Sequence, residues 1–341
     1  MNAAFHILLL LFPSILFPGT GLCEDSSVVL RESSDSNIVF MFWNLENFFD
    51  YRDYGNNSSD REFSSFGKRR WTKKRFYDKC NAVAKAVLWT GDRFGKLPDA
   101  IGFAEVENSF VLYSLCNSTL LRKSDYKMVH FDSPDPRGID VALIYRESVF
   151  RKARSVPIHI RDSSGNIMNT RDILLSTLVI KDSGDTVHLL VNHHPSKFSG
   201  AKTSEGRRTA AVETLAHICD SLESKSSGMI VAMGDFNDTP DASSFASLDR
   251  RLTNLAYELH SQGKGSIRFS GKWDLIDMFF VSGGFSDRYK MDVLAIPFLM
   301  TRDTSYPGDK PLRTYSGPRY LGGVSDHLPV VLYGKDYFIL E

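Results

Sequence analysis

Near its carboxyl end the chain reads Gly322-Gly323-Val324-Ser325-Asp326-His327-Leu328-Pro329-Val330-Val331-Leu332. The apolar run 328–332 predicts a short buried strand, so an acid and an imidazole stand where that strand begins. A serine hydrolase built on Ser325 would need a distant base and an elbow of the form G-x-S-x-G, which the sequence lacks. Asp326 and His327 are better suited to act as a metal ligand and as a contact for a phosphoryl oxyanion.

Four earlier clusters repeat this pattern of polar residues at the end of an apolar run. On an extended segment, side chains two residues apart point the same way, so Asn44 and Glu46 share a side, as do Asp235 and Asn237. Each cluster also reads plainly as a turn or as solvated polar residues, but their coincidence with buried strands favours a common site. The clusters are Asn44 and Glu46 after residues 37–43, Glu105 within 98–106, His193 and His194 after 187–192, and Asp235 and Asn237 after 229–233.

The acids of these clusters suit metal-assisted hydrolysis of a phosphoester. Glu105 interrupts an apolar strand, where a carboxylate needs a partner such as a divalent cation. Asp235 can orient a water molecule, and Asn237 can brace a pentacovalent transition state. Asp277, inside the apolar run 275–281, can pair with a histidine and fix its tautomer.

Histidines and cations supply the remaining candidates. Adjacent residues of a strand face opposite ways, so only one of His193 and His194 can face the site. Lys197 and Arg313 can contact a phosphate or remain solvated. The basic run 68–75 is more typical of the polar start of a helix than of a phosphate track.

The order of apolar runs predicts the fold class. Strands are expected at 37–43, 98–106, 141–145, 173–180, 187–192, 229–233, 275–281 and 328–332, and helices at 71–89, 109–121 and 205–222, with a long loop at 51–68. Strands and helices mix without regular βαβ alternation, and no repeat is visible. This favours one α/β domain in which two sheets pack face to face with helices outside.

These clusters together resemble the endonuclease/exonuclease/phosphatase superfamily, whose members include deoxyribonuclease I-like nucleases, inositol polyphosphate phosphatases and bacterial sphingomyelinases. The resemblance covers residues 37–341. It rests on WNLENFFD at Trp43, FAEVEN at Phe103, VNHHPSK at Val191, GDFND at Gly234, LIDMFF at Leu275 and GVSDHLPV at Gly323. It implies a four-layered α/β sandwich with two mixed sheets, and dependence on Mg²⁺ or Mn²⁺.

The resemblance also implies roles for individual residues. The implied metal ligands are Glu105, with Asn44 and Glu46 beside it and Asp326 in support; relatives often have Asp where Glu46 stands. The implied catalytic residues are Asp235 for the attacking water, Asn237 for the phosphate, His327 for the phosphoryl oxygen, Asp277 to orient His327, and His193 for the leaving group. Arg137 and Asp140 lie in PDPRGIDVALIYR, which resembles the strand beside the site and makes them candidate substrate contacts with Lys197 and Arg313.

The amino-terminal segment predicts targeting. Residues 5–17 are almost wholly apolar and small residues precede Glu24, which is typical of a signal peptide over residues 1–23, followed by a polar linker over 24–36. The n-region has no Lys or Arg, so an uncleaved anchor remains an alternative, and Cys23 raises a minority lipoprotein interpretation. Cys80, Cys116 and Cys219 fall among apolar helical positions and are expected to be buried.

The leading hypothesis is a secreted, periplasmic or envelope-associated metal-dependent phosphodiesterase, most simply a nuclease that acts as a monomer. Lys+Arg and Asp+Glu both number 41, so no global field attracts a polyanion. The first alternative is therefore a phosphatase or a phospholipid or sphingomyelin phosphodiesterase, with membrane association through the amino terminus. A non-catalytic binding module on the same fold is the alternative from another class.

Overall fold

The computed structural model describes residues 38–337, apart from residues 53, 56–57 and 198–200. The predicted signal peptide, the linker and Cys23 lie outside the described residues. All described elements belong to one compact unit, residues 33–341.

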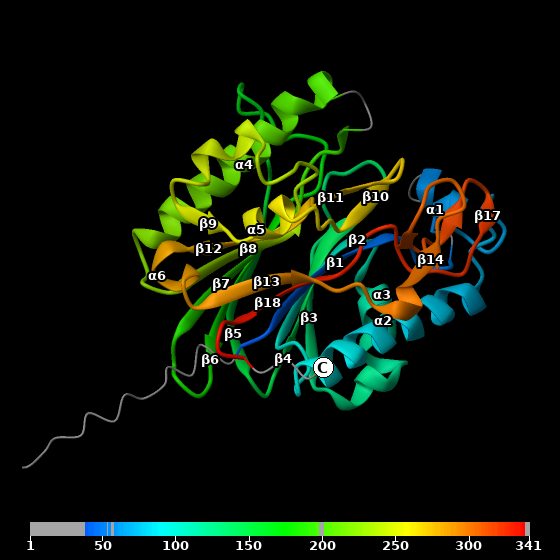
Figure 1. Ribbon diagram of the computed structural model, residues 1–341, viewed down its shortest axis with the longest axis horizontal. Coiled ribbons are helices and arrows are strands. Elements are labelled where there is room, and N and C mark those ends of the chain that lie inside the picture. Colours follow the sequence, from blue (N-terminus) through cyan, green and yellow to red (C-terminus); the bar gives the residue numbers. More distant parts are fainter. Residues whose placement is uncertain (1–37, 53, 56–57, 198–200, 338–341) are drawn as a thin grey trace, which may run out of the picture. The chain divides into compact units, whose positions relative to one another are not determined.

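Two six-stranded mixed sheets form the centre of this unit (Figure 1). In each sheet the two central strands are parallel and the outer strands pair antiparallel. The first sheet has the order β13 (Tyr289–Val293), β18 (Val330–Gly334), β1 (Phe40–Phe48), β2 (Ala100–Val106), β4 (Asp140–Arg146) and β3 (Tyr126–His130). The second has the order β5 (Phe150–Ile158), β6 (Ile173–Ile180), β7 (Thr186–His193), β8 (Met229–Asp235), β12 (Asp277–Ser282) and β9 (Leu252–Asn254).

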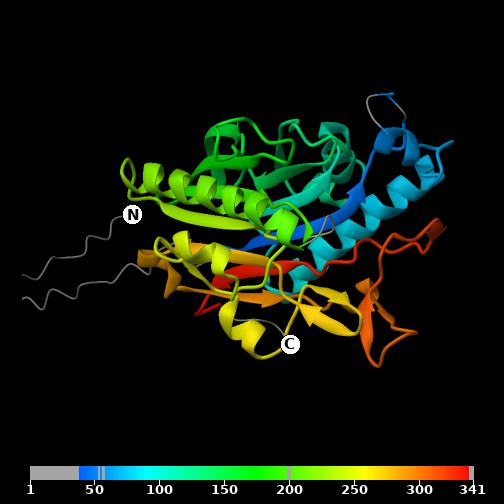
Figure 2. The same cartoon turned by 90° about the horizontal axis from the view of Figure 1, so that it is seen from above.

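Helices cover the outer faces of both sheets, which confirms the predicted α/β sandwich. Helix α4 (Ala201–Glu223) packs on the second sheet, where it lies over the green strands in Figure 2. Helices α2 (Lys73–Arg93) and α3 (Ser109–Asn117) pack on the first sheet. The remaining helical segments are α1 (Ser58–Glu62), η2 (Leu120–Lys123), η4 (Ser243–Ser247), α5 (Tyr257–Ser261), α6 (Gly283–Ser286) and η5 (Pro297–Leu299).

The alternation of side chains along β1 shows why both faces of this strand must be apolar. Phe40 and Phe42 lie in the core between the two sheets, whereas Met41 and Trp43 lie in the core beneath α2 and α3. All four are fully buried, so the continuous apolar run of the sequence is explained.

Helix α2 begins at a standard cap, because the Thr72 side chain accepts a hydrogen bond from the Arg75 amide.

Strand register brings the polar clusters to one edge of the sandwich. The parallel pairs β1–β2 and β7–β8 end together, with His193 opposite Asp235. Strand β12 runs the other way and begins there, with Asp277 also opposite Asp235. Strand β18 pairs antiparallel with β1, so the residues that precede Val330 lie near the end of β1. Residues far apart in the sequence therefore meet at this edge.

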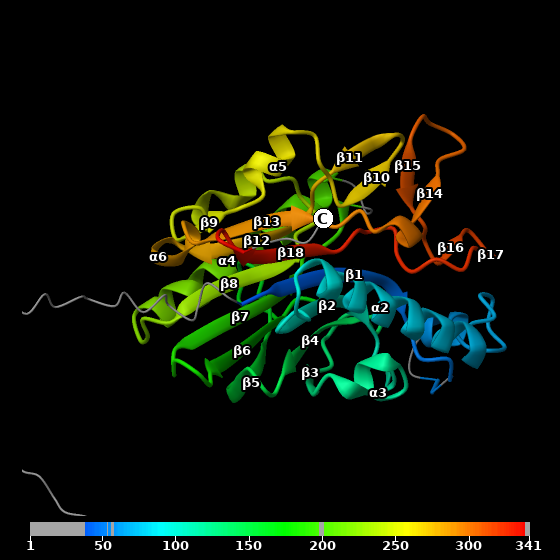
Figure 3. The same cartoon turned by 60° about the horizontal axis from the view of Figure 1, so that its bottom comes forward.

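Several sequence predictions of secondary structure were incomplete. Strands β3, β5 and β13 were missed, and the predicted loop 51–68 contains α1. Three small hairpins were also missed; Figure 3 shows them grouped beyond β18. They are β10–β11 (Ile267–Phe269, Lys272–Asp274), β14–β15 (Met300–Arg302, Asp309–Pro311) and β16–β17 (Tyr315–Ser316, Arg319–Tyr320).

The three cysteines of the described residues lie in the core. Cys80, Cys116 and Cys219 are buried and free, as expected. Among the helices of residues 38–337 that the structure describes, none has both the length and the apolar character needed to span a bilayer.

Candidate active site

A buried aspartate–histidine pair lies at the centre of the strand-end edge. His327 Nδ1 lies 2.7 Å from Asp277 Oδ2, and Asp277 is fully buried. Burial by itself lowers the pKa of His327, but the Asp277 carboxylate outweighs it, so the pKa stands well above the usual value. His327 is therefore an imidazolium at neutral pH, with its Nε2 directed to within 3.9 Å of Asp235 Oδ2.

Asp235 is held at the end of β8 by amides on both sides. Its Oδ2 accepts a hydrogen bond of 3.0 Å from the Asn44 side chain, and its Oδ1 accepts one of 2.9 Å from the Asn237 backbone. Burial raises the pKa of Asp235 to about 7, while the charge of His327 opposes the rise. A carboxyl group with such a pKa can take up and release a proton near neutrality, as a general base must.

Glu105 and His193 complete the cluster from the ends of β2 and β7. Glu105 Oε2 accepts a 2.7 Å hydrogen bond from the Asn47 amide, and its Oε1 lies 3.9 Å from His193 Nε2. The same histidine nitrogen lies 3.6 Å from Asp235 Oδ2. Burial, and then the charges of Arg171 and Arg137, hold the pKa of His193 well below its usual value, so its ring is neutral.

The alternation of β7 decides which of the two adjacent histidines serves the site. His194 turns away, and its ring meets that of Phe236 edge-on with centroids 4.9 Å apart. Burial lowers the pKa of His194 to about 3, so this ring is also neutral. The buried Arg171 fixes the strand end by donating to the His193 carbonyl at 3.1 Å and to the His194 carbonyl at 2.6 Å.

Glu46 is tied to the loop that precedes β18. Its Oε1 accepts a 3.0 Å hydrogen bond from Arg313 Nε, and its Oε2 accepts one of 2.8 Å from the Thr314 amide. Arg313 also donates to Asp326 at 2.8 Å. Burial, reinforced by the charge of Asp326, raises the pKa of Glu46 to about 7.

A buried lysine lies beneath this loop. Lys79 Nζ donates to the Glu46 carbonyl at 2.8 Å and to Thr314 Oγ1 at 2.9 Å, and the residue is only 2% exposed. Burial lowers its pKa to about 8, although the neighbouring carboxylates oppose this. Sequence analysis did not identify Lys79. Its signal was a charge at position 79 on the apolar face of the predicted helix, one turn after Phe76 and one before Val83.

The donor set fits a hard divalent cation. More carboxylates than cationic side chains crowd this edge, and fully buried Asp277 Oδ1 has no hydrogen-bond partner. Within the described part of the chain, Glu105 Oε1 also receives no hydrogen bond, whereas both oxygens of Glu46 are engaged. Oxygen-rich sites of this kind suit Mg²⁺ or Mn²⁺. The residues that would hold the ion are Glu105 first, then Asn44, Glu46 and Asp326.

The other predicted substrate contacts have different surroundings. Arg137 lies at the margin, half-exposed, with its amide bonded to Asp135 and its charge acting on His193. Lys197 is bound to Asp238 at 2.6 Å, not to the cluster. Asp140 is buried and accepts hydrogen bonds from the Ser133 amide and hydroxyl. Their roles as substrate contacts remain predictions.

Comparison with known proteins places this geometry in a family. The model of the endonuclease/exonuclease/phosphatase family matches residues 39–335. No curated protein sequence matches the chain. Three similar solved structures share its fold at low identity. They are the human Nocturnin catalytic domain with bound sulfate (17% identity, TM-score 0.55, 88% of this chain and 95% of that one), a mannosyl-6-phosphatase of Bacteroides thetaiotaomicron (15%, 0.55, 87% and 99%) and D. rerio TDP2 with a single-strand DNA product (15%, 0.52, 87% and 98%).

At these identities the structural likeness supports the fold alone. The family model, by contrast, spans nearly all of the described residues, and its range includes every strand end that carries a site residue. The chain therefore belongs to the endonuclease/exonuclease/phosphatase family of phosphoester hydrolases.

Proposed function

We propose that the protein hydrolyses phosphodiesters by in-line attack of water, with the help of a divalent cation, and that its substrate is a nucleic acid. The observation that carries the reaction type is the position of Asp235. It lies between a neutral His193 at 3.6 Å and a charged His327 at 3.9 Å, and it is oriented by Asn44. A proton acceptor and a fixed positive charge therefore face one small volume, as hydrolysis of an anionic ester requires.

Each side chain has one task in this proposal. Asp235 accepts the proton of the attacking water. His327 holds a phosphoryl oxygen with Nε2–H, because Asp277 keeps its other nitrogen protonated and its ring charged. Neutral His193 stabilises the leaving group. Glu105, with Asn44, Glu46 and Asp326, would hold a cation that would neutralise charge on the equatorial oxygens of the phosphate.

Asn237 has a more restricted part than the sequence suggested. Its side-chain nitrogen donates to the His194 carbonyl at 3.0 Å, and its backbone amide holds Asp235. The side chain therefore positions the residues that follow β7 and β8, and contact of its oxygen or nitrogen with the phosphate would require this hydrogen bond to be shared or broken. Asn237→Ala should lower kcat and also shift the pH profile of Asp235.

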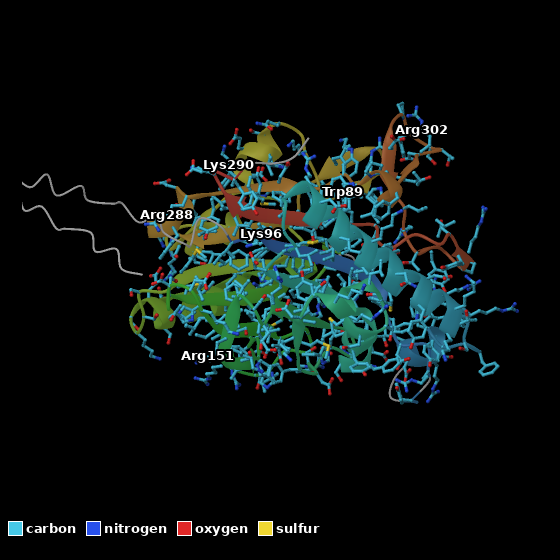
Figure 4. The ribbon with its side chains drawn as sticks, turned by 90° about the horizontal axis from the view of Figure 1, so that it is seen from below. Trp89, Lys96, Arg151, Arg288, Lys290 and Arg302 are labelled. Atoms are coloured by element: carbon cyan, nitrogen blue, oxygen red, sulfur yellow. The ribbon has the colours of Figure 1, made fainter. Side chains whose placement is uncertain are left out.

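A second candidate is hydrolysis of a small phosphoester. A pocket of about 550 Å³ begins two residues beyond Glu105 and is lined by four carboxylates, those of Glu107, Asp132, Asp135 and Asp140. Burial raises the pKa of Glu107 to about 8, and Asp135 is paired with Arg171, so Asp132 and Asp140 supply the charge that disfavours a long polyanion on that side of the site. Figure 4 labels five cations of one face, which come from several elements; they are Lys96, Arg151, Arg288, Lys290 and Arg302. The mannosyl-6-phosphatase is an example of a similar fold named for a small substrate.

One experiment tests the reaction and separates the two substrate classes. The purified chain is assayed with Mg²⁺, Mn²⁺ or EDTA on plasmid DNA, single-stranded DNA, RNA, bis-p-nitrophenyl phosphate and a panel of phosphomonoesters. Asp235→Ala and His327→Ala should abolish turnover without loss of fold. Cleavage of DNA or RNA supports the nuclease proposal, and cleavage of monoesters alone replaces it with the second candidate. Full activity in either variant would refute the assigned mechanism.

We also propose that residues 1–23 direct secretion and are removed. Sequencing the amino terminus of the protein recovered from its native cells tests this. A mature chain that begins near Glu24 supports the proposal, and a mature chain that still contains residues 5–17 contradicts it.

A further inference from the structure

A second cluster of metal-binding side chains lies at the ends of the loop between β3 and β4. His130 ends β3, Asp140 begins β4, and Asp132 stands in the loop itself. One potential ligand atom from each of the three lies within 4.8 Å of the other two. None of the three takes part in the Asp277–His327–Asp235 arrangement described above.

The imidazole of His130 points into this cluster without a hydrogen bond. Its side chain is 6% exposed, and its buried Nε2 has no hydrogen-bond partner. The nearest acceptor, Asp140 Oδ2, is 3.3 Å away, longer than the usual N–H···O distance of about 2.9 Å. A buried ring nitrogen left in this way is costly unless something else binds it.

The same separation suits a shared metal ion. Two ligands bound at about 2.0–2.1 Å to a tetrahedral Zn²⁺ are about 3.3 Å apart. Asp140 Oδ1 is engaged by the Ser133 amide at 2.9 Å and by the Ser133 hydroxyl, which leaves Oδ2 directed to His130. Asp132, with a side chain 92% exposed, can turn toward the ion, since one of its ligand atoms already lies within 4.8 Å of a ligand atom of each of the other two residues.

Access and charge agree with a cation. Asp132 and Asp140 line the acidic pocket of about 550 Å³, which opens the cluster to solvent. An imidazole with carboxylates suits Zn²⁺ better than the all-oxygen preference of Mg²⁺.

We propose that His130, Asp132 and Asp140 form a structural site for Zn²⁺, distinct from the catalytic cation site, with water as the remaining ligand. The ion joins the two ends of loop 131–139. That loop carries Asp135, which holds Arg171 at 2.8 Å, and Arg171 in turn binds the carbonyls of His193 and His194. Zinc bound at the loop therefore stabilises the strand end that presents His193.

Calorimetric titration with Zn²⁺ tests the site. The metal-free chain is titrated in excess Mg²⁺, which occupies the oxygen-rich catalytic site. We expect one equivalent of Zn²⁺ to bind, and His130→Asn to weaken its binding at least 100-fold. Asp132→Asn, at an exposed position that does not endanger folding, should weaken it at least tenfold. Glu105→Gln should leave this equivalent in place.

His260→Asn is the matched control, because His260 Nε2 also faces a single aspartate, Asp241, at 3.6 Å on the surface. That variant should bind Zn²⁺ like the unmodified chain. Zinc should also raise the Tm of the unmodified chain and of His260→Asn, but not of His130→Asn. The proposal would be overturned if the unmodified chain bound no Zn²⁺, or if His130→Asn and Asp132→Asn bound Zn²⁺ as tightly as the unmodified chain.

Discussion

Replacing Asp277 by asparagine removes one charge from the centre of the site while the shape of the side chain is kept. Asp277 is fully buried at the start of β12, and its Oδ2 lies 2.7 Å from His327 Nδ1. The amide can still meet the ring, but it can no longer hold it as an imidazolium. We expect the pKa of His327 to fall, since burial is then opposed only by the weaker effects of Asp235 and Asp326.

The size of the effect follows from this distance. Two unit charges 2.7 Å apart attract by roughly 6 kcal/mol at an effective dielectric constant of about 20. Loss of that attraction lowers the pKa of His327 and so reduces the share of charged rings. Removing one preorganised donor to a developing oxyanion costs about 10²–10³ in kcat. We therefore expect kcat of Asp277→Asn to fall by a factor of about 10²–10³, with KM changed much less.

The assay is the pH dependence of kcat/KM on bis-p-nitrophenyl phosphate or on the substrate found above. The alkaline limb reports the loss of the His327 proton, and in Asp277→Asn it should move to lower pH. His159→Gln is the control, since it breaks an Asp–His pair of almost equal length, 2.8 Å to Asp172, and should keep full activity. A folded Asp277→Asn enzyme with unchanged kcat and an unchanged alkaline limb would refute the assigned role of the pair.

Three further predictions follow from the buried groups. Lys79→Met should raise the Mg²⁺ concentration for half-maximal activity about tenfold, because the Glu46 carbonyl loses its 2.8 Å donor. Lys74→Met, at an exposed position of the same helix, should leave that concentration unchanged. Activity measured over a series of Mg²⁺ concentrations tests both expectations. Since burial raises the pKa of Asp235 to about 7, kcat/KM should rise with pH up to that value and then level. Added Mg²⁺ should move this rise to lower pH. A kcat/KM that does not change from pH 5 to 8 would contradict the role of Asp235 as the base. Burial lowers the pKa of His194 to about 3, so as the pH falls this residue is protonated in the unfolded chain before it is protonated in the folded one. The free energy of unfolding should therefore fall between pH 6.5 and pH 3, by up to about 1.4 kcal/mol per pH unit. In urea titrations, His194→Leu should lack this contribution to the pH dependence.

The central strands could be predicted from the sequence, and the site followed from them. Strands β1, β2, β7 and β8 are buried on both faces, so each appears as a largely apolar run, interrupted in β7 by His188, that ends at polar residues. The missed strand β5 shows the reverse. In Phe150–Ile158 four consecutive residues are exposed. This strand lies at the edge of the second sheet, so it pairs with a neighbouring strand on one side only. Strands β3 and β13 likewise mix lysine with apolar residues.

The partners of the site residues could not be predicted in the same way. Arg313, a candidate phosphate contact, lies between Glu46 and Asp326, which are 267 and 13 residues away in the sequence. Arg171 precedes a strand in a polar segment and gives no signal of its contact with the His193 carbonyl. These contacts depend on how loops return across the strand ends, and hydrophobic periodicity does not report loop paths.

The backbone at the strand ends carries the strongest physical sign of function, and the sequence hides it. Glu46, Asn47, Glu105 and Asn237 all have positive φ, between 43° and 62°, in a region that non-glycine residues rarely adopt. Only three other described non-glycine residues do so, Arg70, Asp125 and Ser270. Each such residue costs on the order of 1–3 kcal/mol, so glycine would stabilise the fold at these positions. Because glycine carries neither a carboxylate nor an amide, the strain at Glu46, Glu105 and Asn237 is explained only if their side chains are needed where the strands end. The same argument accounts for Lys79, which holds the strained Glu46 through its backbone carbonyl and leaves the side chain of Glu46 to other partners.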